Sequence, residues 1–325
     1  MNWLITGGCG FLGTALIARL TSEAGHKIRV IDNLSVGTRE DLGLVCNYKT
    51  ILPTQVTEDF DKNSVQLIVG DILDSELAFQ VTRGVEIIVH FAANTGVGPS
   101  VEDPRADMQA NVIGTFNYLE AARINNCPRF VFASSGAPAG EVDPPIHEEL
   151  PPHPVSPYGA SKLAGEGYCS AYNRTFGIDT VILRFGNVYG PGSLRKSSVV
   201  AKFIRQAINN ETLEIYGDGT QTRDFIFIND LIEAVTRAAS VCGIGGEAFQ
   251  IASNRETTVG EMAELLVQKL HSNGFDEIRL INTERRLGDV MRNYSDTSKA
   301  RDKLGWKIEV SLDEGLQKTV EYFLK

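Results

Sequence analysis

The sequence predicts an α/β protein with a doubly wound parallel sheet and a smaller C-terminal α/β lobe. Up to about residue 190, short apolar runs alternate with longer segments of helical periodicity. Unbroken apolar strands separated by helices are typical of a parallel sheet that helices cover on both faces. Beyond Gly190, glycine, proline and charged residues become denser, and 325 residues are long for a single core. The chain is therefore expected to form two lobes.

The elements expected in the first part of the chain follow this alternation. Strands are predicted at Trp3–Thr6, Lys27–Ile31, Val65–Val69, Ile87–Phe91, Arg129–Ala133 and Thr180–Phe185. Helical periodicity covers Leu12–Ala24, Pro104–Asn125, Val199–Asn209 and Val259–Asn273. We expect residues 1–187 to form the first domain, with 224–250 returning to it. The smaller lobe then comprises 188–223 and 251–325.

Composition narrows the classes of function. The net charge of −10 argues against broad binding to nucleic acid or anionic membranes, because phosphate contacts need clustered Lys and Arg. The five cysteines are odd in number and form no CxxC motif, and the five histidines lack metal-ligand spacing. We therefore expect reduced thiols and no metal site. No segment resembles a signal peptide or a membrane span of about 20 apolar residues, so a cytoplasmic protein is expected.

A glycine-rich turn follows the first predicted strand and opens a helix. Gly7, Gly10 and Gly13 have the spacing GxxGxxG. Glycines permit a tight turn, close approach of the backbone to a pyrophosphate, and close packing of helix on strand. The N-terminus of the helix, with Phe11 and Leu12, then offers N–H groups and a positive dipole end to the phosphates. This context predicts a dinucleotide site on a Rossmann domain.

The acidic residue at the end of the second predicted strand selects the dinucleotide. Asp32 lies 19 residues after Gly13, where a carboxylate accepts hydrogen bonds from the adenosine ribose and repels the 2′-phosphate of NADP. The next basic residue is Arg39. NAD is therefore the expected cofactor, although Asp32 could instead cap a turn. Asp71 could contact the adenine, and a turn aspartate is nearly as plausible.

Tyr158 and Lys162 form the second informative pair. Ser156 can cap and Pro157 can start the helix that carries them, and the i, i+4 spacing places both on one face. A free tyrosine has a pKa of about 10 and is almost entirely protonated at neutral pH, so it cannot serve as a base there. We expect the ammonium of Lys162 and a positive nicotinamide ring to lower the pKa of Tyr158. Tyr158 can then take a proton from a substrate hydroxyl while hydride leaves the same carbon.

Taken together, the motifs resemble the extended short-chain dehydrogenase/reductase family, specifically its nucleotide-sugar epimerases and dehydratases. The resemblance covers essentially the whole chain. The matching segments are Thr6–Gly13 (TGGCGFLG), His90–Ala93 (HFAA), Ser100–Pro104 (SVEDP), Asn111–Thr115 (NVIGT), Tyr158–Lys162 (YGASK), Arg184–Gly192 (RFGNVYGPG), Tyr216–Leu231 (YGDGTQTRDFIFINDL), Arg286–Val290 (RLGDV) and Leu304–Trp306 (LGW).

The resemblance implies roles for further residues. Ser135 aligns with the catalytic Ser/Thr, and Lys162 would also hold the nicotinamide ribose. Asn187 would hold the substrate diphosphate by its side chain or backbone N–H, Arg223 and Arg286 would neutralise it, and Tyr216 would lie near the base. The remaining cofactor contacts implied are Asn33, Ile72, Phe91, Ala92, Ala93 and Asn111. The remaining substrate contacts implied are Gly136, Val200 and Asp289.

A departure from the family pattern bears on the reaction. Sugar 4,6-dehydratases carry an Asp-Glu pair just after the catalytic Ser/Thr, and the decarboxylases usually keep the glutamate. Here Gly136 and Ala137 stand in those places, and Ala139 replaces the usual tyrosine. Because 4-epimerisation needs no extra acid, it is favoured. NAD ends that reaction as it began, so a retained cofactor is expected.

Substrate and alternatives stay open. A UDP-hexose or a UDP-hexuronate is favoured. Asn293 would admit an N-acetyl group, Tyr294 would exclude it if the register slips by one, and Arg292 or a donor from the Gly136 turn could meet a uronate carboxylate. The alternatives are a 2-epimerase, a dehydratase or a decarboxylase on the same scaffold, and a catalytically idle NAD-binding regulator.

The family also implies a homodimer. Its members pair through helices that correspond to Pro104–Asn125 and Pro157–Phe176. Phe116, Leu119, Leu163 and Tyr172 could form that seam, and an internal role in the core is as plausible for each.

Overall fold

The computed structural model describes residues 1–61, 64–193, 195–196, 198–284 and 290–325. The chain folds into two compact units. The first comprises Met1–Gly140, Pro151–Arg184 and Val235–Phe249, and the second comprises Glu141–Leu150, Phe185–Ala234 and Gln250–Lys325. Residues 141–150, expected in the first domain, thus group with the second unit, and 235–249 rather than all of 224–250 group with the first. The assignment of cofactor and substrate to separate domains stays a prediction.

The first unit is built on one sheet. Its strands are β1 (Asn2–Thr6), β2 (Lys27–Asp32), β3 (Tyr48–Thr50), β4 (Val65–Val69), β5 (Ile87–His90), β6 (Arg129–Ser135), β7 (Asp179–Phe185) and β12 (Glu247–Ile251). Their order is β12-β7-β6-β5-β1-β2-β4-β3, and the pairs from β3 to β6 are parallel. From β1 the next strands are added on one side of the sheet, and from β5 onward strands are added on the other side. The boundary between β1 and β5 is therefore the topological switch point, where such sheets bind ligands. The predicted doubly wound sheet is confirmed, and β3 and β12 are added to the six expected strands.

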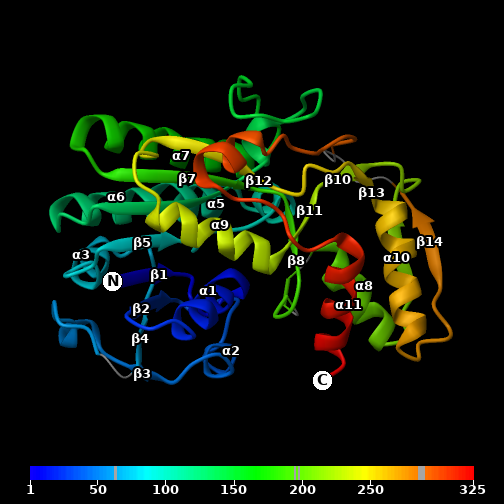
Figure 1. The fold of residues 1–325 in the computed structure, drawn as a ribbon, viewed down its shortest axis with the longest axis horizontal. Coiled ribbons are helices and arrows are strands. Elements are labelled where there is room, and N and C mark those ends of the chain that lie inside the picture. The colour runs from blue at the N-terminus through cyan, green and yellow to red at the C-terminus, as the bar shows by residue number, and fades with distance from the viewer. Residues whose placement is uncertain (62–63, 194, 197, 285–289) are drawn as a thin grey trace. The chain divides into compact units, whose positions relative to one another are not determined.

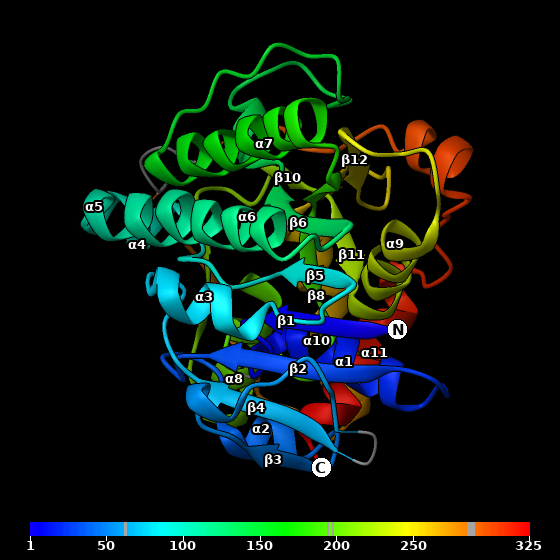
Figure 2. The same ribbon diagram turned by 90° about the vertical axis from the view of Figure 1, so that its left-hand side faces the viewer.

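Helices cover both faces of this sheet (Figure 2). The helices α3 (Ser75–Val81), α6 (Gly114–Ile124) and α7 (Pro157–Phe176) lie side by side on one face, and α1 (Phe11–Thr21) lies on the other. The shorter helices are α2 (Arg39–Gly43), α4 (Val97–Glu102) and α5 (Pro104–Met108). The single helix expected over Pro104–Asn125 is instead α5, a π-helical turn η2 (Gln109–Ile113) and α6.

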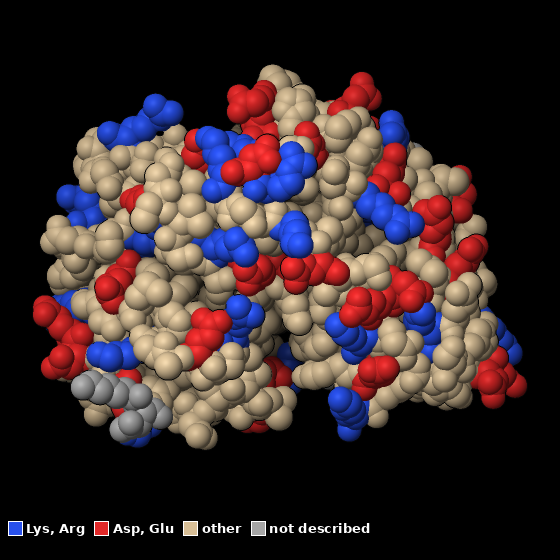
Figure 3. Space-filling model, viewed as in Figure 1, with Lys and Arg blue, Asp and Glu red and all other residues tan. Residues whose placement is uncertain are grey.

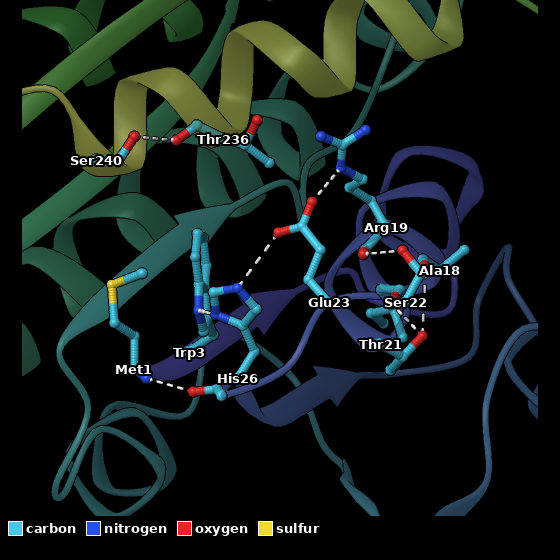
Figure 4. Close-up of polar contacts among 12 residues, drawn as sticks. Met1, Trp3, Ala18, Arg19, Thr21, Ser22, Glu23, His26, Thr236 and Ser240 are labelled. Carbon is cyan, nitrogen blue, oxygen red and sulfur yellow. Dashed lines mark hydrogen bonds and ion pairs between the residues drawn. The ribbon is translucent and has the colours of Figure 1, made fainter.

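Apolar strand residues make the core, and a polar cluster closes the amino ends of the strands. Leu4, Ile88 and Phe130 are fully buried on neighbouring strands. Trp3 Nε1 donates to His26 Nδ1 at 3.0 Å, and Glu23 lies between His26 and Arg19 (Figure 4). These contacts secure the end of the sheet remote from the glycine turn, which lies at the carboxyl end of β1.

The second unit contains short strand pairs and four longer helices (Figure 1). The pairs are β8 (Asn187–Tyr189) with β11 (Phe225–Phe227), β9 (Leu213–Tyr216) with β14 (Leu280–Thr283), and β10 (Thr222–Arg223) with β13 (Thr257–Thr258). The helices are α8 (Val199–Ile208), α9 (Ile228–Ser240), which continues into the first unit, α10 (Val259–Ser272) and α11 (Leu312–Phe323). α10 packs on α8 and on α11.

One face of the molecule carries acidic and basic side chains interspersed (Figure 3). Within the described ranges, no helix is long and apolar enough to cross a membrane.

Candidate active site

The glycine turn joins β1 to α1 and brings main chain close to main chain. Gly7 has a φ of +67°, and a Cβ there would lie 2.8 Å from the backbone N of Ala92. A Cβ on Gly13 would lie 2.4 Å from the Cα of Gly8. Gly10 occupies the N-cap of α1 and has no side chain to cap it. The turn is thus a backbone cradle at a helix N-terminus, which fits the pyrophosphate of a dinucleotide.

Asp32 both caps a turn and secures this cradle. Its Oδ2 accepts from the backbone N of Cys9 at 2.9 Å, inside the glycine turn, and its Oδ1 accepts from the backbone N of Leu34 at 2.8 Å. Burial raises the pKa of Asp32, and these two hydrogen bonds oppose that rise. Each carboxylate oxygen has a second lone pair, which leaves an acceptor for a ribose hydroxyl.

The remaining expected cofactor residues cluster at the same edge of the sheet. Asn33 Nδ2 donates to Asp71 Oδ2 at 3.0 Å and so links the ends of β2 and β4. Phe91, Ala92 and Ala93 follow β5 and are half-buried. Ile72 is 8% exposed, and its side chain reaches the place where a Cβ on Gly114 would stand.

The expected catalytic residues meet where β6 ends and α7 begins. Ser156 caps α7 by accepting from Gly159 N at 3.1 Å, as expected. The side chain of Ser135 lies close enough to the Tyr158 phenol to lower the pKa of Tyr158. Lys162 is buried and donates to the carbonyl of Ala133 at 2.9 Å, with its Nζ 6.0 Å from the centre of the Tyr158 ring. A hydroxyl, a phenol and an ammonium therefore lie together at the carboxyl end of β6.

Burial shifts the pKa values of Tyr158 and Lys162 against their charged forms. Burial raises the pKa of Tyr158 to about 12, interaction with the Ser135 side chain lowers it, and the charge of Asp107 raises it. Burial lowers the pKa of Lys162 to about 8, while the charges of Asp107 and Glu166 raise it. Desolvation thus dominates for the protein alone. The lowering of the Tyr158 pKa by Lys162 together with a positive nicotinamide ring stays a prediction.

An ion pair that the sequence motifs do not predict links α7 to the sheet. Glu166, one turn after Lys162, is paired with Arg184 at 2.7 and 2.9 Å, and Ser134 Oγ donates to Glu166 Oε1 at 2.5 Å. These contacts link α7 to β6 and β7. The signal available in the sequence was a carboxylate at i+4 from Lys162.

Asn111 has structural contacts inside the protein. It is 1% exposed, and its amide bonds to the side chains of Asp107 and Ser161 and to the backbone of Asn94. The side chain of Asn111 therefore joins α5, η2 and α7. The expected cofactor contact of Asn111 stays a prediction.

In the second unit, the structure narrows the expected substrate contacts. The backbone N of Asn187 donates to the carbonyl of Asp224 at 2.7 Å, so of the two predicted modes only its exposed side chain is left. Arg223 Nη1 donates to the carbonyls of Thr222 and Val290, and Lys202 Nζ lies 3.3 Å from the hydroxyl of Tyr216.

Other expected contacts in this unit differ from the prediction or lie outside the description. Val200 is 1% exposed on α8, so its side chain packs in the core, and the expected substrate contact of Val200 stays a prediction. Arg292 is paired with Glu256 at 2.8 and 2.9 Å, which engages the guanidinium that could have met a uronate. Gly136 begins the short turn η3 (Ala137–Ala139) and is half-buried. Arg286 and Asp289 lie outside the described residues.

Comparison with known protein families identifies the family of this chain. Residues 3–252 match the model of the NAD-dependent epimerase/dehydratase family. The chain belongs to this family. The resemblance seen in the sequence motifs is thereby confirmed.

Members of the family with similar sequences are named as enzymes of nucleotide sugars. A UDP-glucose 4-epimerase of Mycolicibacterium smegmatis is 35% identical over 99% of this chain and 98% of its own length. A dTDP-glucose 4,6-dehydratase of Streptomyces niveus is 31% identical over 99% of this chain and 93% of its own.

Solved structures agree in fold over the whole chain. The UDP-glucose 4-epimerase of Thermotoga maritima, solved with UDP-glucose, has a TM-score of 0.88 and 33% identity, covering 100% of this chain and 99% of its own. The UDP-glucuronic acid 4-epimerase of Bacillus cereus, solved with UDP-glucuronic acid and NAD, has a TM-score of 0.88 and 29% identity with the same coverage.

Proposed function

We propose that this protein is an isomerase, an NAD-dependent 4-epimerase of a UDP-hexose or UDP-hexuronate. The observation that carries the proposal is the group formed by Ser135, Tyr158 and Lys162, followed directly by Gly136 and Ala137. Interaction with the Ser135 side chain lowers the pKa of Tyr158, and neither Gly136 nor Ala137 can titrate. The group can move a proton at a sugar hydroxyl, and these two positions lack the acid pair that a dehydratase needs. The named epimerases among the relatives support this reading.

NAD would be held by the backbone cradle of Gly7–Gly13, by Asp32 at the adenosine ribose, and by Lys162 at the nicotinamide ribose. The clash of any Cβ at Gly7 or Gly13 with main chain supports this placement. When bound, NAD supplies a hydride acceptor and donor for C4 of the sugar and a positive charge that favours the phenolate of Tyr158.

The side chains divide the proton transfer. Tyr158 takes the proton from the O4 hydroxyl as C4 is oxidised to a ketone, and returns it when C4 is reduced from the opposite face. Ser135 donates to the phenolate, which lowers the pKa of Tyr158, and it can donate to O4 in turn. Lys162 stays charged below a pKa of about 8 and orients the site by its bond to Ala133. The side chains of Asn187, Arg223 and Arg286 would hold the diphosphate, and Tyr216 would lie near the uracil.

A homodimer in the cytoplasm is the proposed working form. Leu119 and Tyr172 are buried in the core, so we do not include them in the proposed dimer interface, whereas Phe116 and Leu163 are half-buried. Apolar side chains that α4, α5, η2 and α7 expose support a seam on these helices: Val97, Val101, Met108, Ile113, Tyr168 and Phe176. The five free thiols suit a reducing compartment. Light scattering should give twice the mass of the chain, and a fully active monomer would contradict the dimer.

The function is tested by incubating purified protein with UDP-glucose, UDP-glucuronate or UDP-N-acetylglucosamine without added NAD. Proton NMR should show the 4-epimer of at least one substrate, approached from either side of the equilibrium. A 4-keto-6-deoxy sugar would instead show a dehydratase. No turnover of any nucleotide sugar, with NAD bound, would favour an idle NAD-binding protein.

A further inference from the structure

Asp107 is a buried carboxylate beside the catalytic helix for which the sequence motifs predict no role. It lies on α5 and is 1% exposed. Its Oδ1 accepts from Asn111 Nδ2 at 3.0 Å. Its Oδ2 is buried and has no hydrogen-bond donor among the residues that the structure describes. A buried carboxylate with one unpaired oxygen is costly unless a cation compensates it.

A short network links this carboxylate to the catalytic turn of α7. Both α5 and η2 pack against α7. Asn111 Nδ2 also donates to Ser161 Oγ at 3.0 Å, and Ser161 Oγ donates to the carbonyl of Tyr158 at 3.1 Å. Ser161 lies between Tyr158 and Lys162 on the chain. The path from Asp107 therefore ends on the backbone that positions both of them.

The charges around this network show what Asp107 compensates. From α7, Lys162, Tyr158, Glu166 and Cys169 face the same interior, and Asp107 raises the pKa of both Lys162 and Tyr158. Glu166 is paired with Arg184, so its charge is already balanced in part.

Among the described residues of other elements, the buried cation that faces this interior, Arg184 on β7, is already paired with Glu166. From β5, His90 is neutral, because burial and the charge of Lys162 lower its pKa to about 3. Arg105 and Glu102, on α5 and α4, are exposed to solvent. Lys162 is the buried cation that Asp107 acts on.

We propose that Asp107 is a positioning residue: through Asn111 it orients the first turns of α7, and its carboxylate is the counter-charge that keeps Lys162 an ammonium beside Tyr158. The catalytic consequence rests on the proposed function, whereas the effect on Lys162 does not. Without the counter-charge, Lys162 loses its proton at a lower pH, and Tyr158 ionises at a lower pH as well.

The direct test is the titration of Lys162 in Asp107→Asn, which keeps the shape and the acceptor for Asn111. The signal is the ¹³Cε resonance of Lys162, assigned with Lys162→Arg. The pKa of Lys162 should fall by about one unit relative to wild type, a tenfold change in the protonation equilibrium. The matched control is Glu102→Gln, which removes one exposed charge from the neighbouring helix and should leave the titration unchanged. An unchanged pKa in Asp107→Asn would overturn the proposal.

Activity and a charge-retaining variant complete the test. If the protein is an epimerase, both limbs of the pH profile of kcat should move to lower pH in Asp107→Asn, with KM within about twofold. A uniform loss of kcat without displacement would show a merely structural role. Asp107→Glu should restore the wild-type titration, and it provides the test if Asp107→Asn does not fold, since a fallen Lys162 pKa in Asp107→Glu would contradict the counter-charge. If no nucleotide sugar turns over, the proposed function fails while the titration still decides the role of Asp107.

Discussion

The candidate binding sites of the two units differ in kind: the first unit offers mainly main chain, and the second offers mainly side chains. At the glycine turn of the first unit, main chain approaches main chain, and a Cβ on Gly13 would lie 2.4 Å from another backbone atom. In the second unit, Arg223, Arg292 and Tyr216 are side chains that already contact other residues of the protein. A backbone cradle leaves few sequence solutions, whereas side-chain contacts can be rearranged. We therefore expect the glycine turn, here called the cofactor end, to be intolerant of substitution. At the second-unit residues, here called the substrate end, we expect substitution to change substrate affinity without disrupting the fold.

Loss of the phenol should have the largest effect. Tyr158→Phe removes the phenol that we propose as the base and should lower kcat by ~10²–10⁴-fold, because that is the usual contribution of a general acid-base group. Bound NAD, measured after denaturation of the purified protein, should match wild type. Turnover within about twofold of wild type would exclude Tyr158 as the base.

The glycine cradle should show the next largest effect. In Gly13→Ala, the new Cβ meets the backbone of Gly7 and Gly8, so the turn must open and retained NAD should be largely lost, with a destabilisation of about 1–3 kcal/mol. Gly43→Ala is the matched control, since a Cβ on this exposed residue of α2 would make only an ordinary contact with the Tyr48 ring at 3.7 Å. It should be neutral or stabilising by up to about 1 kcal/mol. Full NAD content and an unchanged Tm in Gly13→Ala would refute the cradle.

Asn187 tests the substrate end without disturbing the fold. Its backbone N bonds to Asp224, so Asn187→Ala keeps that bond and removes only the exposed amide. A hydrogen bond to a charged group contributes about 1.5–3 kcal/mol, so KM for a UDP-sugar should rise at least about tenfold. The melting temperature is the control and should stay constant. An unchanged KM would remove Asn187 from the diphosphate site.

The sequence predicted what local spacing can encode. The glycine turn, Asp32 and the pair Tyr158 and Lys162 each join a residue type to a fixed offset from a strand end or helix start. The network around Asp107 and Asn111 could not be read in this way, because Asn111 and Ser161 are 50 residues apart and meet only when α7 packs on η2.

Burial was the other quantity that the sequence did not reveal. The side chain of Val200, a predicted substrate contact, is buried in the protein core. Burial raises the pKa of Tyr158 to about 12 in the protein alone, a contribution that the motif does not show. A motif states which groups are present and does not state how much water reaches them.

Arg292 should show the smallest effect and sharpens the substrate choice. Its guanidinium is bidentate with Glu256 and half-exposed, and surface pairs of this kind contribute about 0–1 kcal/mol. We expect Arg292→Gln to change KM for UDP-glucose and UDP-glucuronate by less than about threefold each, measured side by side. A selective rise of tenfold or more with UDP-glucuronate would mean that Arg292 leaves Glu256 to bind the uronate. That result would make the substrate end a site that rearranges on binding, in contrast to the rigid cradle at Gly7–Gly13.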